Sequence, residues 1–257
     1  MEYAIISVPA APVRRKPSHR KEMTNQLLFG DAVRILKRKG KRWVKVESLY
    51  DGYKGWVTNH LITIVKRKKA LQPSICLTGE IINTINFNGS IMHVPLGACL
   101  PNFENNVGEI GSLKYEYSGK KICVSDQNIS KGELVEKYSK QWLNVPYLWG
   151  GKTILGVDCS GFAQMVFKMV GVAVLRDAWQ QAEQGKLVPN LVEAQRGDLA
   201  FFDDKDEIVH VGILLGDDKI IHAAGKVRID TITEKGIINS DTGKQTHQLK
   251  IIKRYYF

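Results

Sequence analysis

The chain has 257 residues, of which 44% are apolar and 25% charged, as is typical of a globular protein. This length allows two or three compact units, and no apolar run reaches the roughly 18 residues of a membrane helix. The net charge of +11 is concentrated at the start, because residues 1–70 hold 17 Lys and Arg against 5 Asp and Glu. No regular set of aromatic residues is interleaved with these cations, so we expect no nucleic-acid partner and no membrane partner.

Residues 1–65 are predicted to form short strands, at 3–8, 32–36, 43–47 and 55–57. Glycines at 40 and 52 supply turns between them, and short strands at close spacing are typical of a small barrel. The stretch 14–30 and the ending Gly52-Tyr53-Lys54-Gly55-Trp56-Val57 resemble a bacterial SH3 domain. We therefore expect an SH3-like domain over residues 1–65.

A second small β domain is predicted over residues 66–127. The basic run at 66–69 marks the junction, and strands are expected at 81–87, 90–94 and 113–117. This segment lacks the Gly-Trp ending of the first one. We interpret it as a second SH3-like barrel, ahead of a third domain at 128–257.

The cysteines and the start of the chain bear on the compartment. None of the four cysteines (Cys76, Cys99, Cys123 and Cys159) belongs to a CxxC pair, which argues against a zinc site or dithiol redox chemistry. The first residues lack the basic stretch, apolar run and cleavage site of a signal peptide. We therefore expect a cytoplasmic protein whose cysteines remain thiols, or a periplasmic or exported one if a leader precedes Met1.

From residue 130 the pattern becomes helical. Apolar residues recur at helical spacing over 132–143, and a second, mostly apolar helix is predicted from 159 to 170, with Gly171 ending it. About four strands follow, between residue 199 and the C-terminal segment 250–256. Helices followed by strands indicate an α+β domain.

Cys159 is the candidate nucleophile. Asp158 is a good N-cap residue, so Cys159 would lie in the first turn of the second helix. Unpaired amides and the helix dipole favour negative charge there, which predicts a lowered thiol pKa. The same amides could stabilise an oxyanion.

His210 and His222 are the candidate base and its partner. The segment around them is predicted to be a β-hairpin, in which a three-residue loop at 216–218 pairs Leu215 with Lys219, Gly212 with His222 and His210 with Ala224. Both histidines then lie on one face, within reach of each other. A two-residue loop would separate them, so the prediction needs an odd loop or a bulge.

The chemistry follows from these positions. His210 would take the proton of the Cys159 thiol and return it to the leaving amine, while His222 orients His210. The other histidines have no comparable setting and are interpreted as surface or packing residues: His19, His60, His93 and His247.

Several motifs together resemble the NlpC/P60 family of cell-wall peptidases. They are Pro146-Tyr147-Leu148-Trp149-Gly150-Gly151, Asp158-Cys159-Ser160-Gly161-Phe162, Arg196-Gly197-Asp198-Leu199, His210-Val211-Gly212-Ile213 and Ile221-His222-Ala223. The resemblance covers about residues 130–257 and implies a papain-like α+β catalytic domain, here preceded by two SH3-like β-barrels, that needs no metal or other cofactor.

The whole chain resembles the γ-D-glutamyl-L-diamino-acid endopeptidases, also called dipeptidyl-peptidase VI. The resemblance implies a muropeptide substrate, L-Ala-γ-D-Glu-diamino acid with a free N-terminal alanine, cut between D-glutamate and the diamino acid during peptidoglycan recycling. We expect a monomer.

The same resemblance implies a set of substrate-binding residues. Asp158 would bind the amine, Ser160 would add a hydrogen bond, and Tyr147 and Trp149 would line the pocket. Two further residues would come from the first SH3-like domain: Tyr53 and Glu22. Trp179 departs from the family pattern, because related enzymes carry a small polar residue after the Arg-Asp step.

Two other functions remain open from the sequence. One is a non-catalytic module that binds cell-wall peptides through its SH3-like barrels, although the presence of Cys159, His210 and His222 weighs against it. The other is a different papain-like cysteine enzyme, an amidase or acyltransferase.

Overall fold

The computed structural model describes residues 1–74, 76–123 and 130–256. These residues form two compact units, Met1–Asp126 with Trp149–Ile154, and Gln127–Leu148 with Leu155–Phe257. The predicted boundary between residues 127 and 128 lies outside the described residues. In the part of the chain that is described, no helix is both long and apolar enough to cross a membrane.

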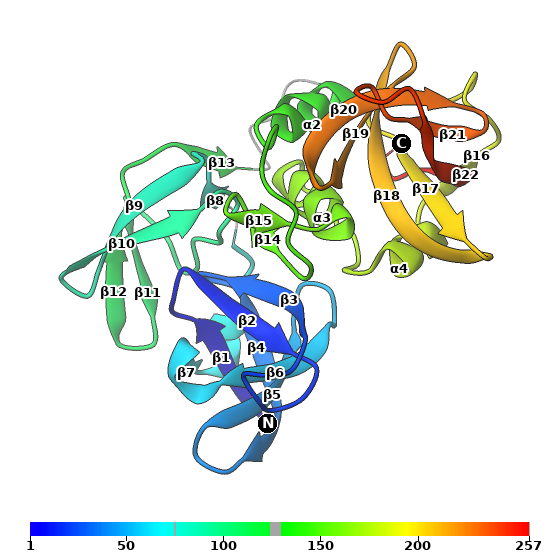
Figure 1. Ribbon diagram of the computed structural model, residues 1–257. Helices are drawn as coiled ribbons and strands as arrows, with labels where there is room; N and C mark the ends of the chain where they lie inside the picture. Colours follow the sequence, from blue (N-terminus) through cyan, green and yellow to red (C-terminus); the bar gives the residue numbers. More distant parts are fainter. Residues whose placement is uncertain (75, 124–129, 257) are drawn as a thin grey trace. The chain divides into compact units, whose positions relative to one another are not determined.

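The first unit starts with a sheet of seven strands. They are β1 (Glu2–Ile6), β2 (Ala10–Arg14), β3 (Met23–Leu28), β4 (Ala32–Lys39), β5 (Trp43–Ser48), β6 (Lys54–Thr58) and β7 (Ile62–Val65), with a 3-10 turn, Asn59–Leu61, before β7. Their order across the sheet is β3-β2-β6-β5-β4-β1-β7 (Figure 1). In β5, Val44 and Val46 are buried. Trp43, Lys45 and Glu47 are only partly covered, as the alternating pattern predicts.

The rest of the first unit contains one short helix and further strands. They are α1 (Arg67–Ala70), β8 (Cys76–Thr78), β9 (Ile82–Phe87), β10 (Ser90–Pro95), β11 (Val107–Ile110), β12 (Leu113–Glu116), β13 (Lys121–Cys123) and β14 (Lys152–Thr153). Four of these strands form a sheet in the order β10-β9-β12-β11. Phe29 meets Phe87 and Tyr115 edge-on, with ring centroids 5.6 and 5.4 Å apart. The second segment is therefore a β domain packed on the first, and its likeness to an SH3 barrel stays a prediction.

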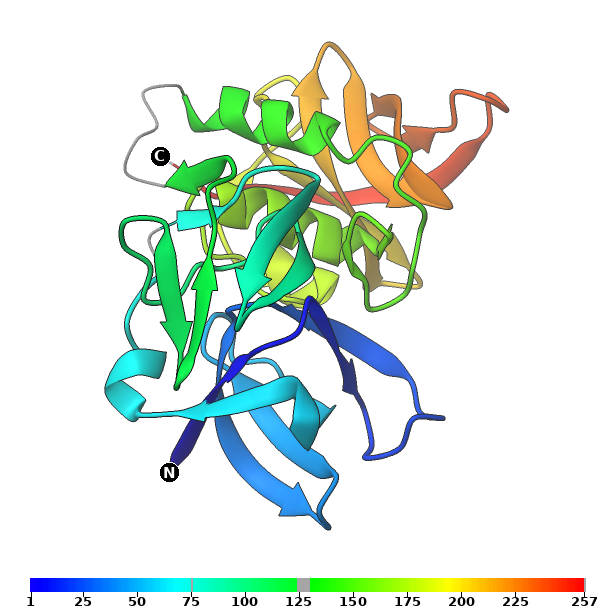
Figure 2. The ribbon, with the colours of Figure 1, turned by 90° about the vertical axis from the view of Figure 1, so that its left-hand side faces the viewer.

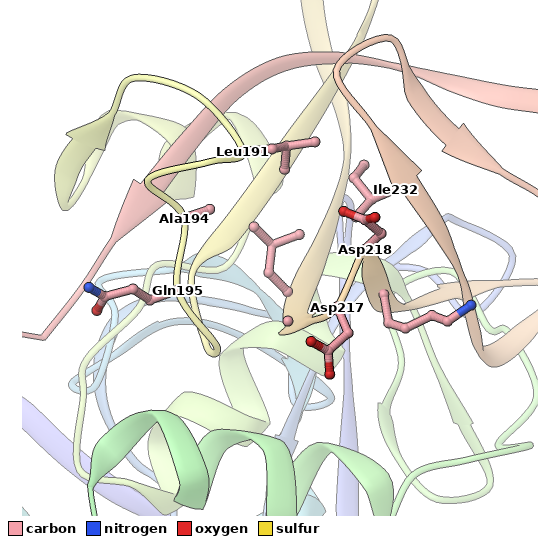
Figure 3. A pocket seen from close by; sticks show the side chains of 9 residues that line it. Leu191, Ala194, Gln195, Asp217, Asp218 and Ile232 are labelled. Atoms are coloured by element: carbon pink, nitrogen blue, oxygen red, sulfur yellow. The ribbon is translucent and has the colours of Figure 1, made fainter.

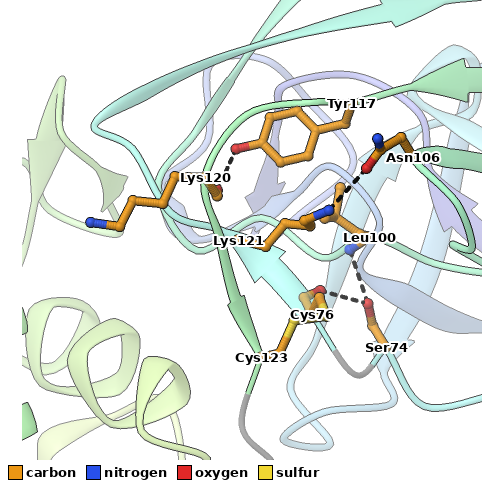
Figure 4. The surroundings of a disulfide bond; sticks show 8 residues. All are labelled: Ser74, Cys76, Leu100, Asn106, Tyr117, Lys120, Lys121 and Cys123. Carbon is orange, nitrogen blue, oxygen red and sulfur yellow. Dashed lines mark hydrogen bonds between the residues drawn. A yellow bond between two sulfur atoms is a disulfide. The ribbon is translucent and has the colours of Figure 1, made fainter. Parts of the chain in front are cut away.

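A disulfide closes this second β domain. Cys76 and Cys123, on the paired strands β8 and β13, are bonded with an S–S distance of 1.99 Å (Figure 4). Cys99 keeps its thiol, which donates a hydrogen bond to Asp31 at 3.4 Å. The expectation that all four cysteines are thiols is therefore wrong for Cys76 and Cys123, because the pairing of two strands distant in sequence brings them together.

The second unit combines three helices with a closed sheet. Its elements are α2 (Lys131–Lys140), β15 (Gly156–Val157), α3 (Cys159–Met169), α4 (Ala178–Glu183), β16 (Lys186–Val188), β17 (Leu199–Asp204), β18 (Glu207–Gly216), β19 (Lys219–Ala224), β20 (Lys226–Thr233), β21 (Gly236–Ile238) and β22 (Gln245–Arg254). The order is β16-β22-β17-β18-β19-β20-β21, and β21 also pairs with β22, which closes a barrel (Figure 1). Helices α2 and α3 pack against each other beside this barrel (Figure 2).

Helix α3 is buried along its whole length. The Asp158 side chain accepts a hydrogen bond from the Gly161 N–H at 2.7 Å, which is the predicted N-cap. The helix ends at Met169, and Gly171 has φ = 75°, the left-handed conformation that suits a glycine after a helix. The helix packs on β18 and β19, so its N-terminus is held against the strands that carry the two predicted histidines.

The β18–β19 hairpin reaches the predicted register by a bulge. Gly212 pairs with His222, as predicted, but Gly216 rather than Leu215 pairs with Lys219. The loop has two residues, Asp217 and Asp218 (φ 50° and 54°), and lies beside a small pocket (Figure 3). A two-residue loop alone would separate the histidines, and the extra residue at Leu215 brings them back to one face.

Candidate active site

The thiol of Cys159 lies between helix α3 and strand β18. Cys159 is the first residue of α3 and is 6% exposed. Backbone N–H groups of Val211 and Ser160 donate hydrogen bonds to its sulfur. Because Val211 directly follows His210 in β18, the thiol is held against the strand that carries the candidate base.

His210 and His222 form a short hydrogen-bonded chain with a buried carboxylate. The distance from His210 Nε2 to His222 Nδ1 is 2.8 Å, and that from His222 Nε2 to Asp230 Oδ2 is 3.0 Å. All three side chains are buried, with Asp230 1% exposed. Arg228 donates two hydrogen bonds to Asp230, at 2.8 and 2.9 Å, and balances its charge.

Asp230 sets the direction of the hydrogen bonds in this chain. Burial raises the pKa of Asp230, but hydrogen bonds from Arg228, Ser240 and His222 outweigh it and bring the pKa to about 2. The ionised carboxylate can only accept, so His222 donates from Nε2 and accepts at Nδ1. His210 then donates from Nε2, which leaves the lone pair of a neutral His210 on Nδ1.

Burial keeps both the nucleophile and the base uncharged. It raises the pKa of Cys159 to about 12, and the Asp158 charge adds to this, against the opposing N–H groups of Val211 and Ser160. It also lowers the pKa of His210 well below 6.5, with His222 and His247 adding to the effect. The prediction that the helix start lowers the thiol pKa is wrong, because desolvation outweighs the amides. The resting pair is a neutral thiol and a neutral imidazole.

Asp158 is tied to an arginine that sequence analysis did not select as a site residue. The Arg176 guanidinium, 1% exposed, donates to both carboxylate oxygens of Asp158, at 3.0 and 2.6 Å. It also donates to the Ser160 hydroxyl at 2.9 Å. Asp158 and Ser160 therefore form one buried network with Arg176, directly around the nucleophile.

The predicted pocket residues divide between the two compact units. Tyr147 lies in the unit of Cys159, and its hydroxyl has a raised pKa because of burial and the nearby Cys159 and Asp158 groups. Trp149 lies in the first unit, where its indole N–H donates to Glu22 at 3.0 Å. Tyr53 also belongs to the first unit, just before β6. The roles of these residues toward substrate stay predictions.

Trp179 lies on helix α4 and is 51% exposed. It lines a pocket with Asp206, Ile208 and Lys250 near the start of β18. Its neighbour Ala178 is the first residue of α4 and is buried. Whether Trp179 narrows the substrate pocket, as its departure from the family pattern suggested, stays a prediction.

Two members of the histidine site were missed from the sequence. Asp230 lies diagonally across from His222, because His222 pairs with Arg228 in the β19–β20 ladder. A tight turn at Gly225 would have been the signal, since it sets this register. His247, interpreted as a surface or packing residue without a comparable setting, stacks on His210 with ring centroids 4.2 Å apart. It lies 37 residues after His210 in the sequence, and only closure of the barrel by β22 brings it there.

The fold and the site define a papain-like cysteine hydrolase, in which a thiol in the first turn of a helix contacts a strand whose histidine is backed by a second histidine. The NlpC/P60 family profile matches residues 144–245, and the profile described as the bacterial dipeptidyl-peptidase SH3 domain matches residues 13–61. The second match supports the expected SH3-like domain at the start of the chain.

Curated relatives cover most of the chain. It is 33% identical over 234 residues to the gamma-D-glutamyl-L-lysine dipeptidyl-peptidase of Bacillus subtilis, spanning 81% of this chain and 76% of that protein. It is 26% identical over 259 residues to dipeptidyl-peptidase 6 of Lysinibacillus sphaericus, spanning 90% and 92%. The crystal structure of an NlpC/P60 family protein from Bacillus cereus has the same fold, with a TM-score of 0.81 at 22% identity over 98% of this chain and 99% of that one. The chain belongs to the NlpC/P60 family and is a cysteine peptidase.

Proposed function

We propose that this peptidase hydrolyses the bond between γ-D-glutamate and the diamino acid in peptidoglycan-derived peptides that carry a free N-terminal L-alanine, and that it serves cell-wall peptide recycling as a monomer. The observation that carries the proposal is the directional chain from His210 through His222 to Asp230, on the strand whose Val211 N–H donates to the Cys159 sulfur. The names of the two relatives that align over most of the chain support the choice of peptide bond.

The reaction starts from the neutral pair. His210 Nδ1 takes the thiol proton as the Cys159 sulfur attacks the γ-carbonyl of D-glutamate, and His222 stabilises the imidazolium that forms. The amides at the start of α3 stabilise the oxyanion. His210 then gives its proton to the leaving amine of the diamino acid, which leaves a thioester. Water, deprotonated by His210, hydrolyses the thioester and restores the thiol.

Recognition of the free amine needs a carboxylate, and the proposal keeps two candidates. Asp158 adjoins the nucleophile, but a substrate ammonium would share its carboxylate with Arg176, which already holds both oxygens. Glu22 is 39% exposed at its side chain and is oriented by the Trp149 indole. Ser160, Tyr147 and Tyr53 are also proposed to bind the substrate.

The experiment compares two pairs of peptides, and the members of each pair differ only at the N-terminal amine. The protein is incubated with L-Ala-γ-D-Glu-L-Lys, with its diaminopimelate analogue, and with the N-acetylated form of each, and products are identified by mass spectrometry. We expect L-Ala-γ-D-Glu to be released only from peptides with a free amine. Cleavage of both forms would contradict amine recognition, and cleavage of neither would contradict the endopeptidase function.

Matched variants test which residue carries out the hydrolysis and which carboxylate binds the amine. Cys159→Ala should abolish release of the dipeptide while leaving the fold intact, which separates hydrolysis from simple peptide binding. Asp158→Asn keeps an N-cap residue, and Glu22→Gln keeps the hydrogen bond to Trp149. The variant that removes the amine-binding charge should raise KM by about tenfold or more for the free-amine peptide, and an unchanged KM in both would contradict these assignments.

A further inference from the structure

Three imidazoles converge in the second unit, and the proposed reaction uses only two of them. His210, His222 and His247 each offer one ring nitrogen, and these nitrogens all lie within 4.8 Å of one another. They come from β18, β19 and β22, three different strands of the barrel. His247 stacks on His210 at a tilt of 24° and meets His222 nearly at right angles, with ring centroids 5.8 Å apart.

The cluster brings three imidazole nitrogens together from three separate strands. A neutral imidazole carries a lone pair on one nitrogen, which makes histidine the commonest side-chain ligand for zinc and related metals. The Nδ1 lone pair of His222 already faces the cluster, whereas the His210 lone pair lies on Nδ1 and reaches Nε2 only when that ring changes tautomer.

The carboxylate of Asp230 orients the cluster through its hydrogen bond with His222. Asp230 accepts from His222 Nε2, which directs the Nδ1 lone pair of His222 toward the other two rings. Metal-binding histidines commonly show this pattern, in which the second ring nitrogen donates to a carboxylate. In a tetrahedral site with bonds of about 2.0–2.1 Å, ligand nitrogens lie about 3.3 Å apart. The three nitrogens, which lie within 4.8 Å of one another, would have to draw together to reach that spacing, and the partly buried His247 is the ring with most room to move.

We propose that His210, His222 and His247 form an inhibitory site for a divalent transition metal such as Zn²⁺, with water completing the coordination. The site overlaps the base of the proposed reaction. Binding at Nε2 of His210 needs the lone pair there, so the hydrogen on that nitrogen moves to Nδ1, and no proton leaves the ring. Nδ1 then has no lone pair to accept the thiol proton, and hydrolysis stops although the thiol itself is not a ligand.

Binding is measured first, in protein that lacks the thiol. Cys159→Ala is titrated with ZnCl2 by calorimetry in a non-chelating buffer, so that the result depends neither on zinc–thiolate bonding nor on the proposed substrate. We expect one zinc per chain. Addition of His247→Phe should weaken that binding by about tenfold or more, whereas His60→Phe, which removes an exposed histidine of the first unit, should leave it unchanged.

Inhibition is measured second, with each variant compared to its own metal-free rate. Zn²⁺ should inhibit the wild-type hydrolysis and EDTA should restore it, and the inhibition constant of His247→Phe should rise about as much as its dissociation constant. The proposal is overturned if Cys159→Ala binds no zinc, if His247→Phe binds it as tightly as its parent, or if His60→Phe weakens binding equally. These binding outcomes stand even if the proposed peptide is not cleaved.

Discussion

Asp230 lies two hydrogen bonds away from the base, yet it determines which nitrogen of His210 is free to act. Its ionised carboxylate accepts from His222 Nε2, and this orders both rings in a single direction. We define it as a positioning residue, because nothing places it in contact with the reacting atoms.

Replacement of Asp230 by Asn should slow the reaction without weakening substrate binding. The amide can present its NH2 group to His222, which would reverse the tautomers and place the His210 hydrogen on the nitrogen that faces the thiol. We expect kcat to fall by about 10- to 100-fold with little change in KM. Steady-state kinetics on the free-amine peptide check this.

The control is Asp241→Asn. Asp241 binds the other side of Arg228, at 2.9 Å, so this variant removes a carboxylate from the same arginine without touching His222. It should keep nearly full kcat. If both variants lose activity alike, the effect comes from Arg228 and not from the tautomers.

The neutral resting pair predicts the pH dependence of the peptidase. His210 acts as a base only when neutral, and burial holds its pKa well below 6.5, so activity should decline only under acidic conditions. Burial also raises the pKa of Cys159 to about 12, so loss of the thiol proton should not limit activity near neutral pH. We expect kcat to stay level between about pH 7 and pH 9, whereas kcat/KM should fall as the N-terminal ammonium of the substrate loses its proton at about pH 8.

The state of the thiol can be tested separately by alkylation. Iodoacetamide reacts with the thiolate, so its rate with Cys159 should rise about tenfold per pH unit from neutral to alkaline pH. Mass spectrometry of the labelled peptide gives that rate. A rate that is already level below pH 7 would indicate a thiolate–imidazolium pair and contradict the neutral one.

The start of helix α3 depends on an ion pair that sequence analysis overlooked. Arg176 and Asp158 are 1% and 7% exposed at their side chains, and Asp158 also caps the helix. Breaking a buried pair leaves a charge without its partner. Arg176→Met should therefore lower the free energy of unfolding by about 3–5 kcal/mol, as measured by urea denaturation.

A surface pair in the same unit provides the comparison. Lys140 and Glu136 lie one turn apart on α2, and the lysine side chain is 48% exposed. Lys140→Met should cost less than about 1 kcal/mol. Equal losses of unfolding free energy in both variants would mean that the buried Arg176–Asp158 pair stabilises the fold no more than a surface pair does.

The two predicted helices and the catalytic hairpin could be recognised from local patterns. Helical spacing and an Asp N-cap located α2 and α3, and alternation located β18 and β19. Strands β2 and β3 were not predicted, because their residue types do not alternate: Ala10–Val13 are all apolar in β2, and the buried Asn25 of β3 is polar. Asp230 and His247 depend on the pairing of β20 and on the closing of the barrel by β22, which single-strand patterns do not specify.

At the scale of the molecule, one covalent bond joins the ends of the second β domain. The Cys76–Cys123 disulfide spans 47 residues and includes β8 to β13. A loop of that length implies a stabilisation of about 4 kcal/mol through restriction of the unfolded chain. The double variant Cys76→Ser/Cys123→Ser should lower the unfolding temperature of the first unit in scanning calorimetry, as should a reductant.

Cys99→Ser is the matched control, because its hydroxyl can still donate to Asp31. This variant should leave the unfolding temperature of the first unit close to that of the wild type. If the disulfide variant unfolds at the same temperature as Cys99→Ser, the bond does not stabilise the domain.

The disulfide also bears on where the protein works. Disulfides persist in oxidising compartments and are rare in the cytosol, so the redox state of Cys76 and Cys123 in the native cell tests the cytoplasmic location expected from the sequence. Alkylation of protein quenched in acid directly from its native cells decides between the two. Two modified cysteines, Cys99 and Cys159, would indicate an oxidising compartment, and four would support the cytoplasm.

With the bulge at Leu215, whether His210 and His222 share a face depends on whether the number of residues between them is odd or even. Adding or removing one residue between His210 and His222 would turn one imidazole to the far side of the sheet, whereas a change of two residues keeps them together. Insertions and deletions in this hairpin should therefore be tolerated in even steps, and in odd steps only where a second irregularity compensates. The length of this turn is thus constrained by the alternation of side chains along the strands as well as by the chemistry of the site.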